Sequence, residues 1–392
     1  MDERENLPAK LAAQGLAATA EKRGSLVGRG LMALRKDNDA LYRQARAVYD
    51  RGGGIRNWNA AKNPAISAAF KIFQQLANEN YGKAFYPLSI LYGGNRDIEE
   101  GKNRAQHFAQ LAFDWCFANQ ANQDAELWCD LGQMYELGCG VEKNDERAVH
   151  WFRKAAEQGD ELGQFNLGLM YEDGLGVGQD GEQAVYWFRK AAEQGNADGQ
   201  SWLGLMYRCG IGVPQNGEQA VYWFHKVAEQ GNADGLVNIG LLYKYGDGVP
   251  QNGEQAMYWF HKAAEQGKAV GLVHIGEMYF SGSGVEKSDA QGVYWFRKAA
   301  EQGDADGQFE LGYLYDEGRV VAQDYQEAVK WYRLAAEQGF TEAQCNLGWI
   351  YENGNGVPQD HKEAVKLFRM AADRGNTRGQ ESLRKLGIDW KK

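Results

Sequence analysis

The segment WFRKAAEQG recurs at a constant interval of 36 residues, and it constrains this chain more than any other feature. Copies of the segment, some of them varied, begin at Trp151, Trp187, Trp223, Trp259, Trp295, Trp331 and Leu367. No insertion interrupts the series. A constant period in this range is typical of stacked repeat arrays, in which each unit packs mainly against its neighbours.

Each 36-residue unit predicts a pair of helices. The first helix carries the pattern (L/I)-G-x-x-Y, as in Leu203, Gly204 and Tyr207, and residues four apart share one helix face. A glycine inside a helix costs about 1 kcal/mol relative to alanine, so we expect a neighbouring helix to approach too closely there for a side chain. The second helix reads EQAVYWFRKAAEQG, whose apolar residues recur at helical spacing.

The turn between the two helices reads G-x-G-V in most units. The first glycine fits a helix end with positive φ, and the second fits a tight turn. The sixth unit departs from this pattern, because Val320 replaces the second glycine after Gly318. We therefore expect a local shift of the backbone at Val320.

The repeats divide the chain into four regions. Residues 1–38 show no repeat and are predicted to be a flexible or loosely docked segment. Residues 39–124 are predicted to form two divergent helix pairs, residues 125–378 seven regular repeats, and residues 379–392 a C-terminal capping helix. The predicted fold is all-α: a right-handed superhelical solenoid of antiparallel helix pairs, with about nine units of 36 residues.

The chain is acidic, with a formal net charge of −10 and a pI near 5.3. Nucleic acids and anionic membranes attract a clustered positive surface, so neither is expected as the main partner. No segment has the ~18 consecutive apolar residues of a membrane span, so no membrane insertion is expected. The first residues, MDERENLPAK, lack the apolar core of a secretory signal. The chain as written is expected in the cytoplasm, or in the periplasm if a leader has been removed.

No set of residues predicts catalysis, a cofactor or a bound metal. The five cysteines do not follow the repeat period and form no CxxC pair, which argues against zinc and redox sites. His274 and Glu277 lie one helical turn apart, as in some metal sites, but the other histidines are dispersed. The G-x-G-V turns lack the Lys-Ser/Thr of a phosphate loop, and no G-x-S-x-G motif occurs. We expect a protein that is not an enzyme.

Residues 125–375 resemble the Sel-one-like repeat family, whose pattern includes A-x-x-x-L-G-x-x-Y-x-x-G-x-G-V and W-(Y/F)-x-x-A-A-x-x-G. The resemblance extends loosely over residues 39–124. One departure is that the usual linker alanine is mostly glycine here, as at Gly199, although Ala343 keeps it. The resemblance implies a scaffold without chemistry of its own. Members of the family resemble adaptors: endoplasmic-reticulum degradation factors, bacterial host-interaction proteins, and immunity proteins that neutralise phospholipase effectors of type VI secretion.

Three positions of the first helix vary freely between the repeats, and Asn166, Leu169 and Asp173 exemplify them. They lie at i, i+3 and i+7, so they share one helix face opposite the Leu/Tyr core. The first helices of such arrays line the concave side, where exposed aromatic residues are typical anchors for a protein partner. Packing between adjacent first helices is the alternative for each residue. The candidate partner-binding residues are Asp130, Gln133, Asn166, Leu169, Asp173, Trp202, Leu205, Tyr245, His274, Glu277, Tyr313, Glu317 and Trp349.

These observations predict a non-enzymatic scaffold that grips one protein partner on its concave face and is monomeric when free. Family resemblance and the acidic, aromatic surface favour a bacterial inhibitor or immunity protein that neutralises a secreted effector enzyme of the type VI phospholipase kind. An adaptor or host-interaction protein is the alternative, and a hydrolase on a repeat scaffold is a remote one. On the second helices, Arg189, His225, His261 and Arg297 share a position that we expect to be a solvated outer face without a role.

Overall fold

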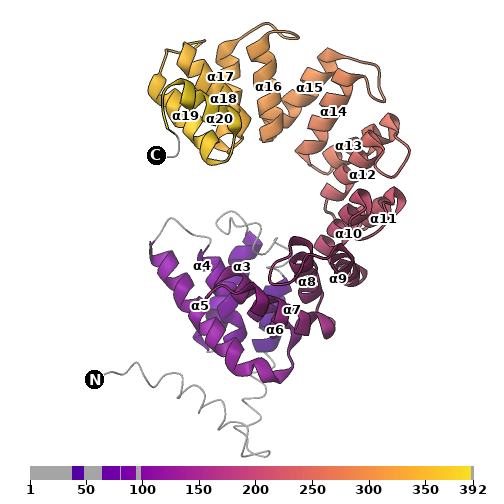
Figure 1. Cartoon of the computed structure of the whole chain (residues 1–392), viewed down its shortest axis with the longest axis vertical. Coiled ribbons are helices and arrows are strands. Elements are labelled where there is room, and N and C mark those ends of the chain that lie inside the picture. Colours follow the sequence, from indigo (N-terminus) through magenta and orange to yellow (C-terminus); the bar gives the residue numbers. More distant parts are fainter. Residues whose placement is uncertain (1–37, 48–63, 80, 94–98, 390–392) are drawn as a thin grey trace, which may run out of the picture. The chain divides into compact units, whose positions relative to one another are not determined.

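The computed structural model describes residues 38–47, 64–79, 81–93 and 99–389. The predicted N-terminal segment, residues 1–38, lies outside the described residues except for its last position. Contacts divide the chain into two compact units, residues 1–178 (unit 1) and residues 179–392 (unit 2). The regular structure of the described residues is helical throughout both units (Figure 1).

In unit 1, the first residues that the structure describes form a helical stretch at residues 38–47. Two α-helices and one short helix in the predicted divergent region follow it: α3 (Pro64–Asn78), η2 (Gly82–Ala84) and α4 (Phe85–Gly93). The next helix is α5 (Glu99–Asn119). The unit ends with η3 (Gln120–Asn122), α6 (Ala125–Leu137), α7 (Asp145–Glu157) and α8 (Glu161–Asp173). The assignment of residues 39–124 to two repeats stays a prediction.

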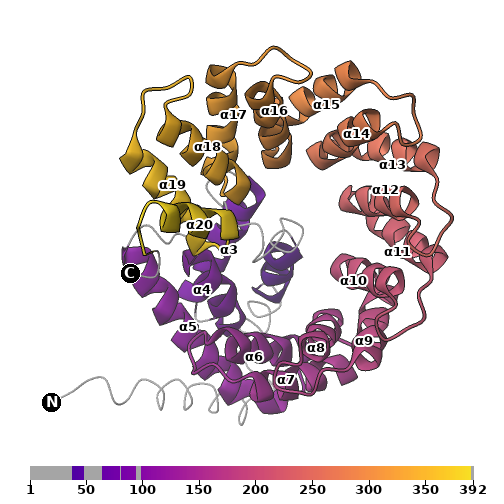
Figure 2. The same cartoon turned by 45° about the horizontal axis from the view of Figure 1, so that its top comes forward.

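Unit 2 consists of regularly alternating helices. They are α9 (Gly181–Glu193), α10 (Ala197–Cys209), α11 (Gly217–Glu229), α12 (Asp234–Tyr245), α13 (Gly253–Glu265), α14 (Ala269–Ser281), α15 (Asp289–Glu301), α16 (Ala305–Glu317), α17 (Tyr325–Glu337), α18 (Thr341–Asn353), α19 (His361–Asp373) and α20 (Thr377–Lys385). Within this unit, Figure 2 shows the first helices α10, α12 and α14 on the inner side of the curve and the second helices α11, α13 and α15 on the outer side. The fold is an all-α solenoid of tandem helix pairs, as the period predicts.

Polar caps and glycines fix where each helix begins and ends. At the start of α11, the Asn216 side chain accepts a hydrogen bond of 3.0 Å from the backbone N–H of Gln219. Such a cap satisfies a backbone donor that has no partner inside the helix. At the end of α10, Gly210 has a φ of 70° and donates to the carbonyl of Met206. Glycine reaches this left-handed conformation without a steric penalty, so the predicted helix stop is confirmed.

The second glycine of the turn also has a positive φ, 66° at Gly212, and it lies against the preceding repeat. A Cβ atom at Gly212 would collide with the backbone of Gly181, the first residue of α9. In the sixth repeat, Val320 cannot follow this conformation: among the described residues, Gln123 is the only non-glycine residue with positive φ. The predicted local change of backbone at Val320 is therefore confirmed.

In six of the first helices, the glycine inside the helix faces an aromatic ring. A Cβ atom at Gly240 would lie 2.5 Å from the ring of Phe260, which is fully buried on α13. The same relation joins a glycine to a ring of the following helix in five other repeats: Gly132 to Phe152, Gly204 to Phe224, Gly276 to Phe296, Gly312 to Tyr332, and Gly348 to Phe368. The predicted close approach of a neighbouring helix is confirmed, and the ring that makes the contact is identified.

One position of the second helices, occupied by arginine or histidine, contacts the next repeat. Arg297 of α15 donates a hydrogen bond of 2.8 Å to the hydroxyl of Tyr315, which is the repeat tyrosine of α16. Arg189 donates in the same way to Tyr207, at 2.7 Å. His225, which occupies the arginine position in the next repeat, instead contacts the ring of Trp259 edge-on at 4.9 Å. The position is half-buried rather than solvated, because its side chains join one repeat to the next. That it has no role in binding stays a prediction.

We predict that Gly240→Ala destabilises the repeat array, because the added methyl group overpacks the contact with Phe260 at a cost of ~1–3 kcal/mol. The gain of about 1 kcal/mol in helix propensity offsets part of this cost, so the expected net loss is up to about 2 kcal/mol. Gly178→Ala is the matched control, since no atom lies within 4 Å of a Cβ atom there and its φ is not positive. Urea denaturation followed by circular dichroism measures both. Equal midpoints for the two variants would contradict the assigned contact.

A second prediction concerns the bond between repeats. Tyr315→Phe removes the acceptor for Arg297 and should cost roughly 0.5–1.5 kcal/mol of unfolding free energy. Tyr243→Phe is the control, because the preceding repeat has His225, which packs on Trp259, in place of the arginine. We expect the control to be nearly neutral. Thermal unfolding by calorimetry checks this, and a Tyr243→Phe loss as large as that of Tyr315→Phe would refute the role of the arginine.

Candidate partner-binding surface

The first of the three variable positions is used for packing. Trp202 is half-buried, and its ring stacks on Phe188 of the preceding second helix, with centroids 5.5 Å apart. His274 takes the corresponding place on Phe260, with centroids 4.8 Å apart. Asn166 is also half-buried and donates to the sulfur of Cys129 at 3.7 Å. All three side chains therefore pack between repeats. Asn166 contacts the adjacent first helix, as the alternative raised from the sequence expects, whereas Trp202 and His274 pack on the preceding second helix.

Side chains at the second and third variable positions are more exposed to solvent than those at the first. At the second position, Gln133, Leu169, Leu205 and Glu277 are half-buried, and Leu205 packs against the core cluster that contains Phe224. At the same position in later repeats, Tyr313 is 37% exposed and Trp349 is 50% exposed. The third position is exposed at Asp173 of unit 1 and at Tyr245 and Glu317 of unit 2. We call the unit 2 residues Leu205, Tyr245, Glu277, Tyr313, Glu317 and Trp349 the first-helix surface.

Three residues of this surface, Tyr313, Glu317 and Trp349, line one pocket of about 400 Å³. We call it the aromatic pocket. Its walls come from α16, from the start of α17, from α18 and from α20. The complete lining is Phe309, Tyr313, Asp316, Glu317, Gln323, Tyr325, Asn346, Trp349 and Arg378. Its volume lies in the range typical of ligand pockets.

A series of hydrogen bonds fixes one side of the aromatic pocket. Arg378 donates to the Asn346 carbonyl oxygen at 3.1 Å, and the Asn346 amide donates to the Tyr332 hydroxyl at 3.0 Å. The Tyr332 hydroxyl in turn donates to the carboxylate of Asp316 at 3.2 Å. Burial raises the pKa of Asp316, and the hydrogen bond from Tyr332 acts in the opposite direction. These bonds hold Asn346, Arg378 and Asp316 in fixed positions.

Aromatic packing holds Phe309 and Tyr313 of the pocket in place. The Phe309 ring stacks on Tyr313 with centroids 6.4 Å apart, and it contacts Tyr332 and Phe340 at 5.8 and 5.0 Å. Such packing restricts the rotamer of Tyr313 while part of its ring stays exposed. Gln323 donates to the Tyr325 hydroxyl at 2.9 Å and so positions that ring at the rim. The pocket is therefore built from side chains with several fixed contacts each.

Two carboxyl groups on α14 and α16, Glu277 and Glu310, have shifted pKa values. Burial opposes ionisation of Glu277, but hydrogen bonds with His274 and from Lys244 lower its pKa to about 2. On α16, burial and the negative charges of Glu277 and Asp306 raise the pKa of Glu310 to about 7. Burial is the largest cause of this raised pKa, and the nearby negative charges add to it.

Asp130 of unit 1 has a different environment from the other candidates. Its side chain is buried, at 5% exposure, and it forms an ion pair of 3.7 Å with Arg46. Arg46 also forms an ion pair of 3.5 Å with Glu126, so it joins the helical stretch 38–47 to α6. Burial raises the pKa of Asp130, and the positive charge of Arg46 opposes this shift. In this structure Asp130 is part of an internal ion-pair network rather than of an open surface.

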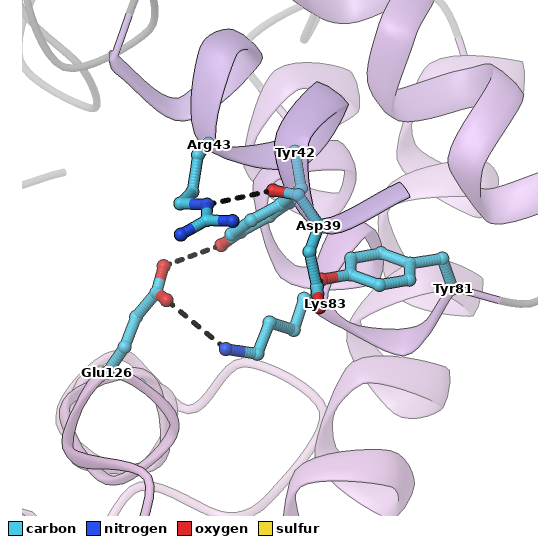
Figure 3. Close-up of a pocket in the computed structure, with 6 residues that line it drawn as sticks. All are labelled: Asp39, Tyr42, Arg43, Tyr81, Lys83 and Glu126. Atoms are coloured by element: carbon cyan, nitrogen blue, oxygen red, sulfur yellow. Dashed lines mark hydrogen bonds and ion pairs between the residues drawn. The ribbon is translucent and has the colours of Figure 1, made fainter. Parts of the chain in front are cut away.

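A smaller pocket of about 220 Å³ lies beside this network in unit 1 (Figure 3). Its polar groups already have partners: Tyr42 donates to Glu126 at 2.8 Å, and Lys83 forms an ion pair of 2.7 Å with Asp124. The lining residues are Asp39, Tyr42, Arg43, Tyr81, Lys83 and Glu126. These interactions hold the helical stretch 38–47 against α6, so the residues that line this pocket stabilise the packing of unit 1.

Within residues 38–47, 64–79, 81–93 and 99–389, no three His, Cys, Asp or Glu side chains are grouped to hold a metal ion. In the same ranges no helix has the length and apolar character needed to cross a membrane. The cysteines Cys116, Cys129, Cys139, Cys209 and Cys345 are all free thiols.

Sequence reasoning missed six of the nine lining residues of the aromatic pocket: Phe309, Asp316, Gln323, Tyr325, Asn346 and Arg378. Asn346 occupies the first variable position, so repeat comparison carried a signal for it. Tyr325 and Arg378 lie on α17 and α20, which the pattern of the first helix does not describe. Only the folded arrangement shows that they border the same space as Trp349.

A known protein family matches the same repeats of this chain. The Sel1 repeat family matches seven segments of the chain: residues 129–160, 162–196, 197–232, 233–268, 269–304, 305–340 and 341–376. The comparison with curated proteins gives no match.

Solved structures of bacterial proteins are similar to this chain. A Sel1 repeat protein from Oxalobacter formigenes is 30% identical, with a TM-score of 0.55, over 81% of this chain and 89% of its own. A protective antigen with an SLR fold from uropathogenic Escherichia coli is 31% identical, with a TM-score of 0.50, over 94% of this chain and 77% of its own. An immunity protein from Pseudomonas aeruginosa is 21% identical, with a TM-score of 0.40, over 57% of this chain and 84% of its own. The seven matched segments show that the chain belongs to the Sel1 repeat family.

Proposed function

We propose that this protein is a non-enzymatic scaffold that binds one protein partner through the first-helix surface of unit 2, centred on the aromatic pocket. One observation carries the proposal: Tyr313 and Trp349, equivalent residues of adjacent repeats, are both partly exposed at the same pocket. Aromatic side chains held in place at a pocket are the commonest anchors of protein interfaces. Membership of a repeat family that forms interaction scaffolds agrees with this role.

Within this class, we propose that the protein is an inhibitor or immunity protein that occludes a secreted effector enzyme, of the type VI phospholipase kind. The resemblance in sequence and the acidic, aromatic surface support this finer proposal. An extended repeat surface can cover an enzyme's active site with many contacts at once. In this proposal the free protein is a monomer, and neither nucleic acid nor an anionic membrane competes for its acidic surface.

The partner can be captured from the native cell with the purified full chain as bait and identified by mass spectrometry. An inhibitor forms a single long-lived complex in which the two proteins are present in equal amounts. Several partners in smaller amounts would favour an adaptor instead. A gene for the captured enzyme beside the gene for this chain would support an immunity role, since a toxin and its inhibitor are needed together.

We predict that Tyr313→Ala combined with Trp349→Ala weakens binding of the captured partner by ~2 kcal/mol or more, because both anchors are lost. Isothermal titration calorimetry with the purified partner measures the change. Thermal stability should fall little, since both side chains are partly exposed.

The matched control replaces two equally large aromatic residues of the second helices, Tyr186→Ala with Tyr222→Ala. Their exposed fractions, 49% and 50%, are similar to that of Trp349. We expect the control to bind the partner like the parent chain. Unchanged affinity in the Tyr313 and Trp349 variant, or an equal loss in the control, would mean that the partner binds elsewhere.

A further inference from the structure

The aromatic pocket combines exposed aromatic faces with carboxylates. Tyr313 and Trp349 present partly exposed rings, and Asp316 and Glu317 are consecutive residues at the end of α16. Ring faces attract cations, and carboxylates form strong hydrogen bonds with cationic donors. The two kinds of group therefore favour the same class of ligand, a positively charged side chain.

Asp316 has acceptor capacity that the protein itself does not use. It accepts a hydrogen bond from the Tyr332 hydroxyl at 3.2 Å, and no lysine or arginine of the described ranges pairs with it. An ionised carboxylate accepts several hydrogen bonds, so one further donor can be accommodated at least. Burial raises the pKa of this carboxyl, and a bound cation would lower it again.

Glu317 shows that a guanidinium group fits at the edge of the pocket. Arg319 of this chain forms an ion pair of 3.0 Å with Glu317, although its own side chain is 75% exposed. Such an exposed pair contributes little stability, so a partner's side chain can displace it at low cost. On the other wall, Arg378 is engaged by Asn346. Arg378 also lines the pocket, but neither it nor Arg319 forms an ion pair with Asp316, so this carboxylate keeps acceptor capacity for a ligand.

We propose that the aromatic pocket receives an arginine side chain of the protein partner. Its guanidinium group stacks on Trp349 and donates hydrogen bonds to Asp316 and Glu317. Arginine fits better than lysine, because a planar group with five donors can stack and bind carboxylates simultaneously. Glu317 is exposed, and its negative charge attracts a basic segment to this surface. The inference rests on the proposed function and specifies the chemistry of the partner.

Nuclear magnetic resonance on the full chain labelled with ¹⁵N tests this directly. The Trp349→Phe variant identifies the indole N–H signal of Trp349, which is then followed during titration with N-acetyl-L-arginine methylamide. The corresponding citrulline compound is the matched probe, because it has the same shape but no charge. We expect a saturable shift of the Trp349 signal, with a dissociation constant at least about tenfold lower for arginine than for citrulline.

Two charge-removing variants sharpen the test. Glu317→Gln should weaken binding of the arginine compound several-fold, because it removes a carboxylate of the pocket. Glu286→Gln, an exposed position that does not line the pocket, should leave it unchanged. The absence of a saturable Trp349 shift, or equal affinity for the citrulline compound, would overturn the inference.

The outcomes separate this inference from the proposed function. If partner capture depends on Tyr313 and Trp349 but the pocket does not prefer arginine over citrulline, the scaffold function stands and the arginine assignment fails. The pocket could instead prefer arginine while the affinity for the partner is unchanged by the Tyr313 and Trp349 substitutions. In that case the arginine preference of the pocket stands, and the proposal that the partner binds at this pocket is wrong.

Discussion

The contact between a helix glycine and an aromatic ring of the following helix sets the geometry of the regular repeats. In the fourth repeat, the absence of a Cβ atom at Gly240 lets the Phe260 ring lie directly on the backbone of α12. The ring fills the space between the two helices, which brings their axes close together. Each helix pair thereby becomes a compact unit whose two partners cannot rotate independently. The order of the array follows from repetition of this contact.

The same contact determines which side chains remain available for binding. Since the glycine and the Leu/Tyr positions are committed to the core, the opposite face of the first helix is free to vary. Along that face, burial decreases from Trp202, which packs on Phe188, to the partly exposed Tyr313 and Trp349. A fixed scaffold that displays variable residues can acquire a specific partner without losing its core.

The sequence predicted much of the fold because a local pattern was repeated seven times in register. Helix pairs, glycine stops and the close approach at Gly240 all depend on residues near each other in the chain. The aromatic pocket was predicted only in part, since Tyr313, Glu317 and Trp349 follow the repeat but Tyr325 and Arg378 come from other helices. Burial of Asp130 was not predicted, because its partner Arg46 lies in a divergent region that repeat comparison does not cover.

Hydrogen–deuterium exchange on the complex with the captured partner tests the central claim most directly. The scaffold account predicts that complex formation slows exchange in α16 and α18, which carry Tyr313 and Trp349, while the outer helices α11 and α13 exchange as in the free chain. Backbone amides are protected where a partner excludes water and suppresses local opening. Protection confined to α11 and α13 would contradict the account and place the partner on the second helices.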